Sequence, residues 1–88
     1  MSEFYRGPVK RSITIAGHQT SISLEPMFWD ALGAAAVERA LPLNALVAQI
    51  DVERIAADDP PNLASAIRLW LFHHHMDAPK SSIGYDAD

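Results

Sequence analysis

The feature that most constrains this chain is a change of hydrophobic period at residue 26. Thr20, Ile22 and Leu24 alternate with polar residues, which is typical of a strand with one buried face. After Pro26 the apolar residues recur with the period of a helix. Proline has a fixed φ and no N–H to lose, so it suits the first helical position. The sequence therefore predicts a strand that leads directly into a helix.

A second alternation precedes this strand and predicts a hairpin. Ile13 and Ile15 alternate with hydroxyl residues, so we expect a first strand over residues 11–16. Gly17 and His18 fit a two-residue type II′ loop, because glycine occupies its first position. That loop pairs Ile15 with Thr20, Ile13 with Ile22, Arg11 with Leu24, Thr14 with Ser21, and Ser12 with Ser23. One face is then aliphatic and the other is nearly all hydroxyl, and a polar face that simply lies in water remains an equally good interpretation.

Three helices are expected after the strands. Their predicted ranges are 26–39, 43–57 and 63–75. Pro42 and the breaker at residues 58–61 separate them, and Asn62 is the predicted N-cap of the third. Trp29 is expected in a core or an interface, where its indole N–H needs a hydrogen-bond acceptor. The third helix is apolar nearly all round, so we expect it to be buried on most sides by its own subunit or by a neighbour.

Composition limits the class of protein. The chain has 88 residues, 49% of them hydrophobic, which is small for a single core and favours oligomerisation. The net charge is −4, but basic residues gather before the strands and acidic residues in the second half.

The expected organisation is a flexible basic arm over 1–9, a core over 10–57, a linker over 58–61, a C-terminal helix over 62–76 and a mobile tail over 77–88. The start of the chain lacks a secretory apolar segment and no run approaches the ~20 residues of a membrane span, so we expect a cytoplasmic protein without a membrane partner.

The residue patterns that support catalysis or metal binding are weak. The chain has no cysteine, which excludes thiolate chemistry and cysteine-based metal sites. His73, His74 and His75 are consecutive, so on a helix they point in directions about 100° apart and do not converge on one ion. Histidines also suit a helix C-terminus, where they complement the dipole. We therefore expect no enzyme, no cofactor and no metal site.

The remaining features suit a DNA-binding protein. A polar strand face follows the basic residues Lys10 and Arg11, and the helix start after Pro42 leaves the N–H groups of Leu43 and Asn44 available for a phosphate. The major groove of DNA admits a two-stranded β-ribbon whose alternate side chains contact base edges. These parts together predict a ribbon that binds DNA.

Residues 19–57 resemble the ribbon-helix-helix family of bacterial DNA-binding proteins of the Arc and MetJ type. Segments 11–25 and 62–68 are similar to a short bacterial subgroup of that family. The resemblance implies a mainly α fold with a short β-ribbon, formed as an intertwined homodimer, here with an extra N-terminal strand and an extra C-terminal helix. A four-stranded ribbon would be too wide for the ~12 Å major groove without rearrangement.

The resemblance also assigns site residues by position. Gln19, Ser21 and Ser23 are expected to contact bases, and the N–H groups of Leu43 and Asn44 to contact phosphates. From their positive charge, Lys10 and Arg11 are also expected to contact phosphates. The residues expected in the dimer core are Ile22, Leu24, Phe28, Leu32, Leu46, Val47 and Ile50. The implied function is a homodimeric or tetrameric transcription regulator that binds double-stranded DNA. The alternative is a dimerisation or protein-partner-binding module, antitoxin-like or a scaffold, that keeps the fold without binding DNA and engages its partner through the C-terminal helix.

Overall fold

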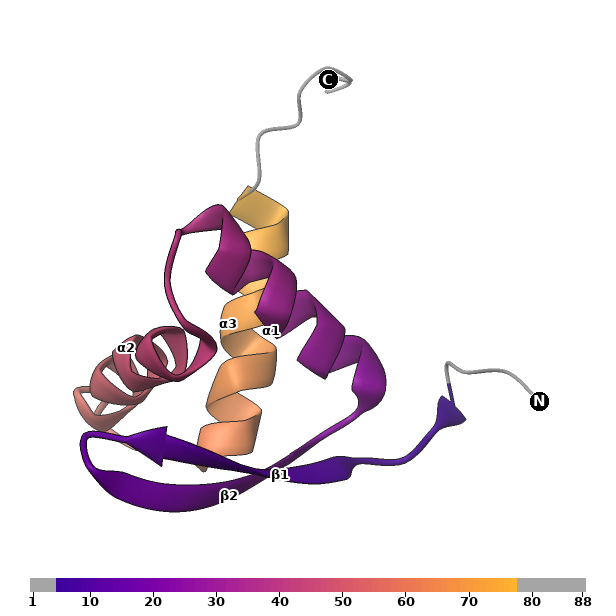
Figure 1. Ribbon diagram of the computed structural model, residues 1–88. Coiled ribbons are helices and arrows are strands. Elements are labelled where there is room, and N and C mark those ends of the chain that lie inside the picture. Colours follow the sequence, from indigo (N-terminus) through magenta and orange to yellow (C-terminus); the bar gives the residue numbers. More distant parts are fainter. Residues whose placement is uncertain (1–4, 78–88) are drawn as a thin grey trace, which may run out of the picture.

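The computed structural model describes residues 5–77, which form a β-hairpin followed by three helices (Figure 1). The elements in chain order are β1 (Val9–Ile15), β2 (His18–Leu24), α1 (Pro26–Glu38), α2 (Leu43–Ile55) and α3 (Leu63–Asp77). This confirms the predicted order of strands and helices. The helix starts at Pro26, Leu43 and Leu63 agree with the prediction, whereas α1 and α2 end slightly earlier and α3 slightly later than expected.

The hairpin register differs from the predicted one. Ile13 lies opposite Thr20 and Ile15 lies opposite His18, so the prediction that paired Ile13 with Ile22 is wrong by two residues. The other predicted pairs, Ile15–Thr20, Arg11–Leu24, Thr14–Ser21 and Ser12–Ser23, are wrong by the same shift. The reason is the turn, which consists of Ala16 and Gly17 rather than Gly17 and His18. Both turn residues have positive φ, 51° and 84°, as a type I′ loop requires. A shift of two residues leaves every side chain on its predicted face.

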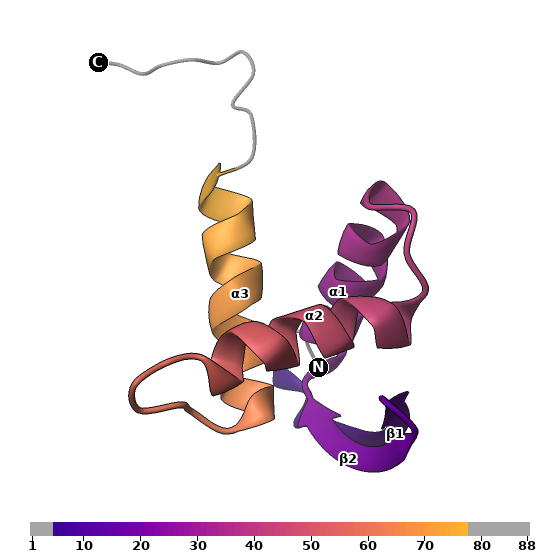
Figure 2. The ribbon, with the colours of Figure 1, turned by 90° about the vertical axis from the view of Figure 1, so that its left-hand side faces the viewer.

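All three helices lie on one side of the hairpin, and the other side carries no described element (Figures 1 and 2). The fully buried side chains come from the hairpin and from each helix. They are Leu24, Leu32, Leu46, Val47, Ile50 and Ile67. The residues expected in a dimer core are thus enclosed within one chain, with Ile22 also buried and Phe28 half-buried. Burial of these residues requires no second copy.

A turn with left-handed backbone at Ala40 sets the angle between α1 and α2. The N–H of Ala40 donates to the carbonyl of Val37 at 3.0 Å, and the N–H of Leu41 donates to that of Ala36 at 2.9 Å. These two bonds and the φ of 56° at Ala40 define a Schellman motif at the end of α1.

No described helix alone has the length and apolar character of a membrane span. Taken together, α1 and α2 have the length and apolar composition of a membrane span, but the two helices are bent by 99° at the break between them.

Trp29 attaches the first strand to α1. Its side chain is only 4% exposed, and its indole N–H donates to the carbonyl of Val9 at 2.9 Å. The guanidinium of Arg11 lies 4.9 Å from the centre of the Trp29 ring, a cation–π distance. The expectation that this indole needs a hydrogen-bond acceptor in the core is confirmed.

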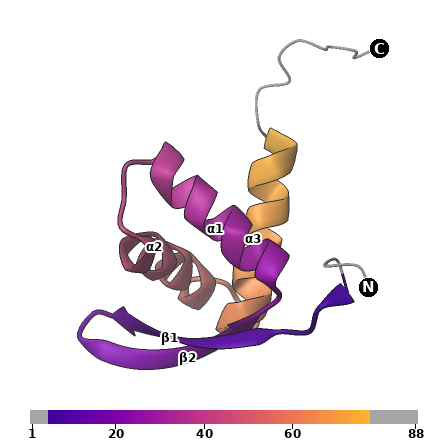
Figure 3. The ribbon, with the colours of Figure 1, turned by 45° about the vertical axis from the view of Figure 1, so that its right-hand side comes forward.

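The third helix, α3, has two different sides. Asn62 caps it as predicted, because its Oδ1 accepts a hydrogen bond from the N–H of Ser65 at 2.8 Å. Ile67 and Leu71 face the core, whereas Leu69, Phe72 and Met76 on the opposite side are 63%, 65% and 58% exposed. Burial of this helix on most sides by its own subunit is therefore excluded for the described chain, and burial by a neighbour stays a prediction. The hairpin and the other helices cover only its inner side (Figure 3).

Candidate nucleic-acid interface

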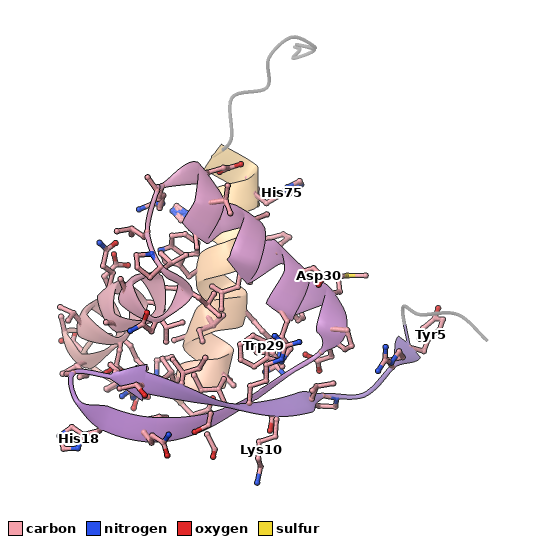
Figure 4. All side chains as sticks on the ribbon, in the orientation of Figure 1. Tyr5, Lys10, His18, Trp29, Asp30 and His75 are labelled. Atoms are coloured by element: carbon pink, nitrogen blue, oxygen red, sulfur yellow. The ribbon has the colours of Figure 1, made fainter. Side chains whose placement is uncertain are left out.

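The outward face of the hairpin is a continuous polar surface. Its members, called here the ribbon face, are Lys10, Ser12, Thr14, Gln19, Ser21 and Ser23. They form three directly opposed pairs: Lys10 with Ser23, Ser12 with Ser21, and Thr14 with Gln19. All are exposed except Ser23, which is half-buried. Figure 4 shows Lys10 pointing away from the helices, while Trp29 lies between α1 and the hairpin. The three predicted base-contacting residues therefore share one accessible face.

This face joins two strands, and although the predicted hairpin placed Ser12 and Thr14 on it, only the β2 residues were predicted to contact bases. Gln19, Ser21 and Ser23 were expected to contact bases, but Ser12 and Thr14 were not. The period of two in residues 12–15 was a sufficient signal, because it places both hydroxyls on the same side of β1. The hairpin then brings them beside the predicted residues of β2.

The charge near this face has one sign. Residues 5–24 contain Arg6, Lys10 and Arg11 and no acidic residue, although the whole chain has a net charge of −4. Lys10 lies on the ribbon face, whereas Arg11, also an exposed residue, lies on the helix-facing side with its guanidinium over the Trp29 ring. The two predicted phosphate ligands on β1 thus flank the strand on opposite sides. A local excess of positive charge favours an anionic partner at this end of the molecule.

The start of α2 contributes backbone donors to a separate surface. The N–H groups of Ala45 and Leu46 both donate to the carbonyl of Pro42 at 3.1 Å, and no side chain caps the helix within the described residues. The N–H groups of Leu43 and Asn44 precede these bonds and belong to the first turn, where helices leave donors for external acceptors. Both residues belong to the start of α2, which lies with the other helices on one side of the hairpin (Figure 2).

An ion pair and an aromatic contact link β2 and α1 to α3. Both Nε and Nη2 of Arg68 donate to Oε1 of Glu25, at 3.0 and 2.8 Å, and the guanidinium lies 5.7 Å from the Phe28 ring. A hydrogen bond to its own backbone, and then the Arg68 guanidinium, lower the pKa of Glu25 below its ordinary value. Glu25 immediately follows β2, so this ion pair connects the end of the ribbon to α3.

The histidines of α3 lie away from the hairpin. His74 stacks on Trp70 with ring centres 5.0 Å apart, and its Nε2 lies 3.2 Å from Oε1 of Glu38. A pocket of about 260 Å³ at this position is lined by Arg39, Glu53, Trp70, His73 and His74. Among the residues that the structure describes, no group of three or more histidine, cysteine, aspartate or glutamate side chains has the geometry to hold a metal ion.

Comparison with protein families identifies the class of this fold. The family model of the ribbon-helix-helix domain matches residues 8–75, and the chain belongs to that family. Domains of this family generally bind DNA as transcription regulators, typically as dimers, and are typically not enzymes. No curated protein and no solved structure matches the chain. The matched region includes β1 and nearly all of α3, so both lie within the family's domain.

Proposed function

We propose that this protein is a sequence-specific DNA-binding regulator of transcription that inserts a two-stranded ribbon into the major groove. One observation carries the proposal: in a ribbon-helix-helix domain, the ribbon face is polar, exposed and free of acidic residues. The major groove admits a two-stranded ribbon, whose alternate side chains point at base edges. All helices lie on the other side, so the ribbon face approaches DNA without obstruction from them (Figure 1).

The three residues of β2 supply different kinds of base contact. The amide of Gln19 is suited to bidentate hydrogen bonding with adenine, which discriminates against other bases by about 1–3 kcal/mol. The hydroxyls of Ser21 and Ser23 donate or accept, so they tolerate several bases. Gln19 therefore provides most of the discrimination in β2.

Phosphate contacts position the ribbon. Lys10 and Arg11 supply charge beside the groove, and the N–H groups of Leu43 and Asn44 supply neutral donors at the start of α2. Such contacts carry affinity without sequence information. Since the family typically binds DNA as dimers, we propose that two copies occupy the site together.

Binding to DNA across salt concentrations tests this function. The wild-type chain is titrated with a duplex selected from a randomised pool, and affinity is expected to fall steeply with salt. Gln19→Ala combined with Ser21→Ala should weaken binding to that duplex by about tenfold or more. Gln49→Ala, which removes an exposed amide from α2, is the matched control and should bind like the wild type. Absence of binding at low salt, or full affinity in the Gln19 and Ser21 variant, would contradict the proposal.

A second candidate function is a dimerisation module that does not bind DNA. It is favoured by the outer side of α3, where Leu69, Phe72 and Met76 form an exposed apolar stripe, and by the acidic net charge. An uncharged stripe is compatible with self-association in a two-fold arrangement, and we propose a second copy of this chain as its occupant. Phe72→Ser should then convert a dimer to a monomer in sedimentation equilibrium. A protein that remains monomeric at all concentrations would exclude this candidate.

A further inference from the structure

We infer that the cleft between α2 and α3 binds a free apolar α-amino acid, whose carboxylate pairs with Arg39 and whose ammonium group pairs with Glu53. This inference does not depend on DNA binding, because the cleft shares no residue with the ribbon face. Two adjoining cavities form the cleft, one with a mainly polar lining and one with a mainly apolar lining.

The two cavities are continuous with each other. The polar one is the pocket of about 260 Å³ beside Arg39. The apolar one has a volume of about 290 Å³ and shares Glu53, Trp70 and His73 with the polar one. Its apolar lining includes Ile50, Ala66 and Leu69. Each volume is close to the lower end of the ~300–1,000 Å³ that is typical of small-molecule sites, so a small ligand with one polar and one apolar end fits the cleft.

Contacts within the chain hold the walls of the cleft in place. Arg54 donates from Nε to Oδ1 of Asp51 at 2.9 Å and from Nη1 to the carbonyl of Pro61 at 3.1 Å, which ties the segment before α3 to α2. The ring of His74 stacks on that of Trp70 within 7° of parallel. The charge of Arg54 is therefore already paired, and this side chain shapes the apolar cavity.

Two charged side chains of the cleft have no ionic partner within residues 5–77. Arg39 forms no ion pair with a carboxylate in this part of the chain, and its guanidinium lies 5.0 Å from the centre of the Trp70 ring. Glu53 likewise forms no ion pair with a cation there. Both side chains line the polar cavity. One positive and one negative group thus border the same space.

The opposite signs of Arg39 and Glu53 select the class of ligand. A ligand with negative charge alone would be repelled by Glu53, and one with positive charge alone would be repelled by Arg39. A zwitterion offers a partner to each, and the arginine fork is suited to a carboxylate. The adjoining apolar cavity removes a hydrocarbon side chain from water, which adds affinity. A free apolar α-amino acid combines these three features in one small molecule.

Titration of the isotope-labelled full chain with single amino acids tests this inference. L-leucine, L-isoleucine, L-methionine and L-phenylalanine are added separately, and the indole N–H signals of Trp70 and Trp29 are followed by NMR. At least one of the four should shift the Trp70 signal saturably. The signal of Trp29 is the internal control and should not respond, because this indole is 4% exposed and is bonded to Val9. No saturable shift of Trp70 with any of the four at about 10 mM would overturn the inference.

Analogues of the amino acid that binds most tightly separate the three contacts. The same molecule without its amino group, and the same molecule without its carboxylate, should each bind about tenfold more weakly or worse. Glycine, which lacks the apolar side chain, should also lose about tenfold or more. An analogue that binds as tightly as the amino acid itself would overturn the inference, because the missing group is then not recognised.

Variants assign the two charges to their side chains. Arg39→Gln should bind the amino acid about tenfold more weakly and should no longer prefer it to the analogue without a carboxylate. Glu53→Gln should lose the preference over the analogue without an amino group. Asp30→Asn removes a carboxylate from an exposed position on α1 and is the matched control, which should bind like the wild type. All three positions are exposed, and thermal unfolding verifies that each variant is folded. Wild-type affinity in both cleft variants, or an equal loss in Asp30→Asn, would contradict the assignment.

Discussion

Ser12 lies directly opposite Ser21 on the exposed side of the hairpin, and this pair joins two strands of one chain into a single polar surface. Beneath that surface, β1 contributes Ile13 and Ile15 to the core, and β2 contributes Ile22 and Leu24. Each strand thus finds an antiparallel partner within its own chain, as the predicted hairpin requires. This arrangement leads to predictions about what holds the hairpin against the helices and what shapes its turn.

The hydrogen bond from Trp29 to β1 is expected to stabilise the fold. Trp29→Phe keeps an aromatic ring but removes the N–H that bonds the carbonyl of Val9. We expect the free energy of unfolding to fall by about 1–3 kcal/mol, from the lost hydrogen bond and the smaller ring. Urea denaturation measures the change. Trp70→Phe makes the same substitution at a half-buried position and should cost less, so an equal or smaller effect at Trp29 would contradict the anchoring of β1.

Two glycines should respond with opposite sign to the same substitution. Gly17 has a φ of +84°, and Gly33 lies inside α1; an added Cβ meets no atom within 4 Å at either position. Gly17→Ala should destabilise the protein by about 1–2 kcal/mol, because alanine is strained at positive φ. Gly33→Ala should stabilise it by up to about 1 kcal/mol, because alanine favours a helix interior. Thermal unfolding of the two variants is the test, and a stabilised Gly17→Ala would exclude the observed turn.

The ion pair of Glu25 should make stability depend on acidity. Its pKa is lowered in the folded state from the ordinary value of 4.5, so the carboxylate favours folding fully above that value and loses its contribution as the pH falls through the lower folded pKa. Glu25→Gln should therefore be less stable than the wild type near neutral pH, and the difference should shrink in acid. Urea midpoints at about pH 7 and about pH 3 measure it. Glu53→Gln on an exposed part of α2 is the control, and a difference for Glu25→Gln that grows in acid would contradict the sign.

Much of the hairpin was predictable because side chains on a strand alternate with a fixed period. Alternation placed Ser21 and Ile22 on the correct faces before the pairing was known. The register was not predictable, since it depends on which two residues form the turn. Ala16 adopts positive φ without the asparagine, aspartate or glycine that usually indicates it, so Gly17 and His18 were the better match to a known turn type. A two-residue error in register left the predicted faces intact.

The helices were predictable from proline positions and apolar spacing, but their neighbours were not. Pro26, Pro42 and the Asn62 cap gave correct starts. The apolar residues all round α3 indicated burial, yet apolar residues do not specify which element covers them. The bond between Trp29 and Val9 joins residues 20 positions apart, so it depends on how the strand and helix are packed together. Base and phosphate contacts depend on a partner as well as on the chain, so no pattern within the sequence specifies them.

The most direct test of the central claim is an NMR titration of the full chain with its selected DNA duplex. The account predicts that backbone amides of the ribbon face, including those of Ser12 and Thr14 in β1 as well as Gln19 and Ser21 in β2, show the largest chemical-shift changes. The outer side of α3, at Leu69 and Phe72, should change little on DNA contact at a constant oligomeric state. Large changes on α3 with an unperturbed hairpin would contradict the claim that the ribbon face binds DNA.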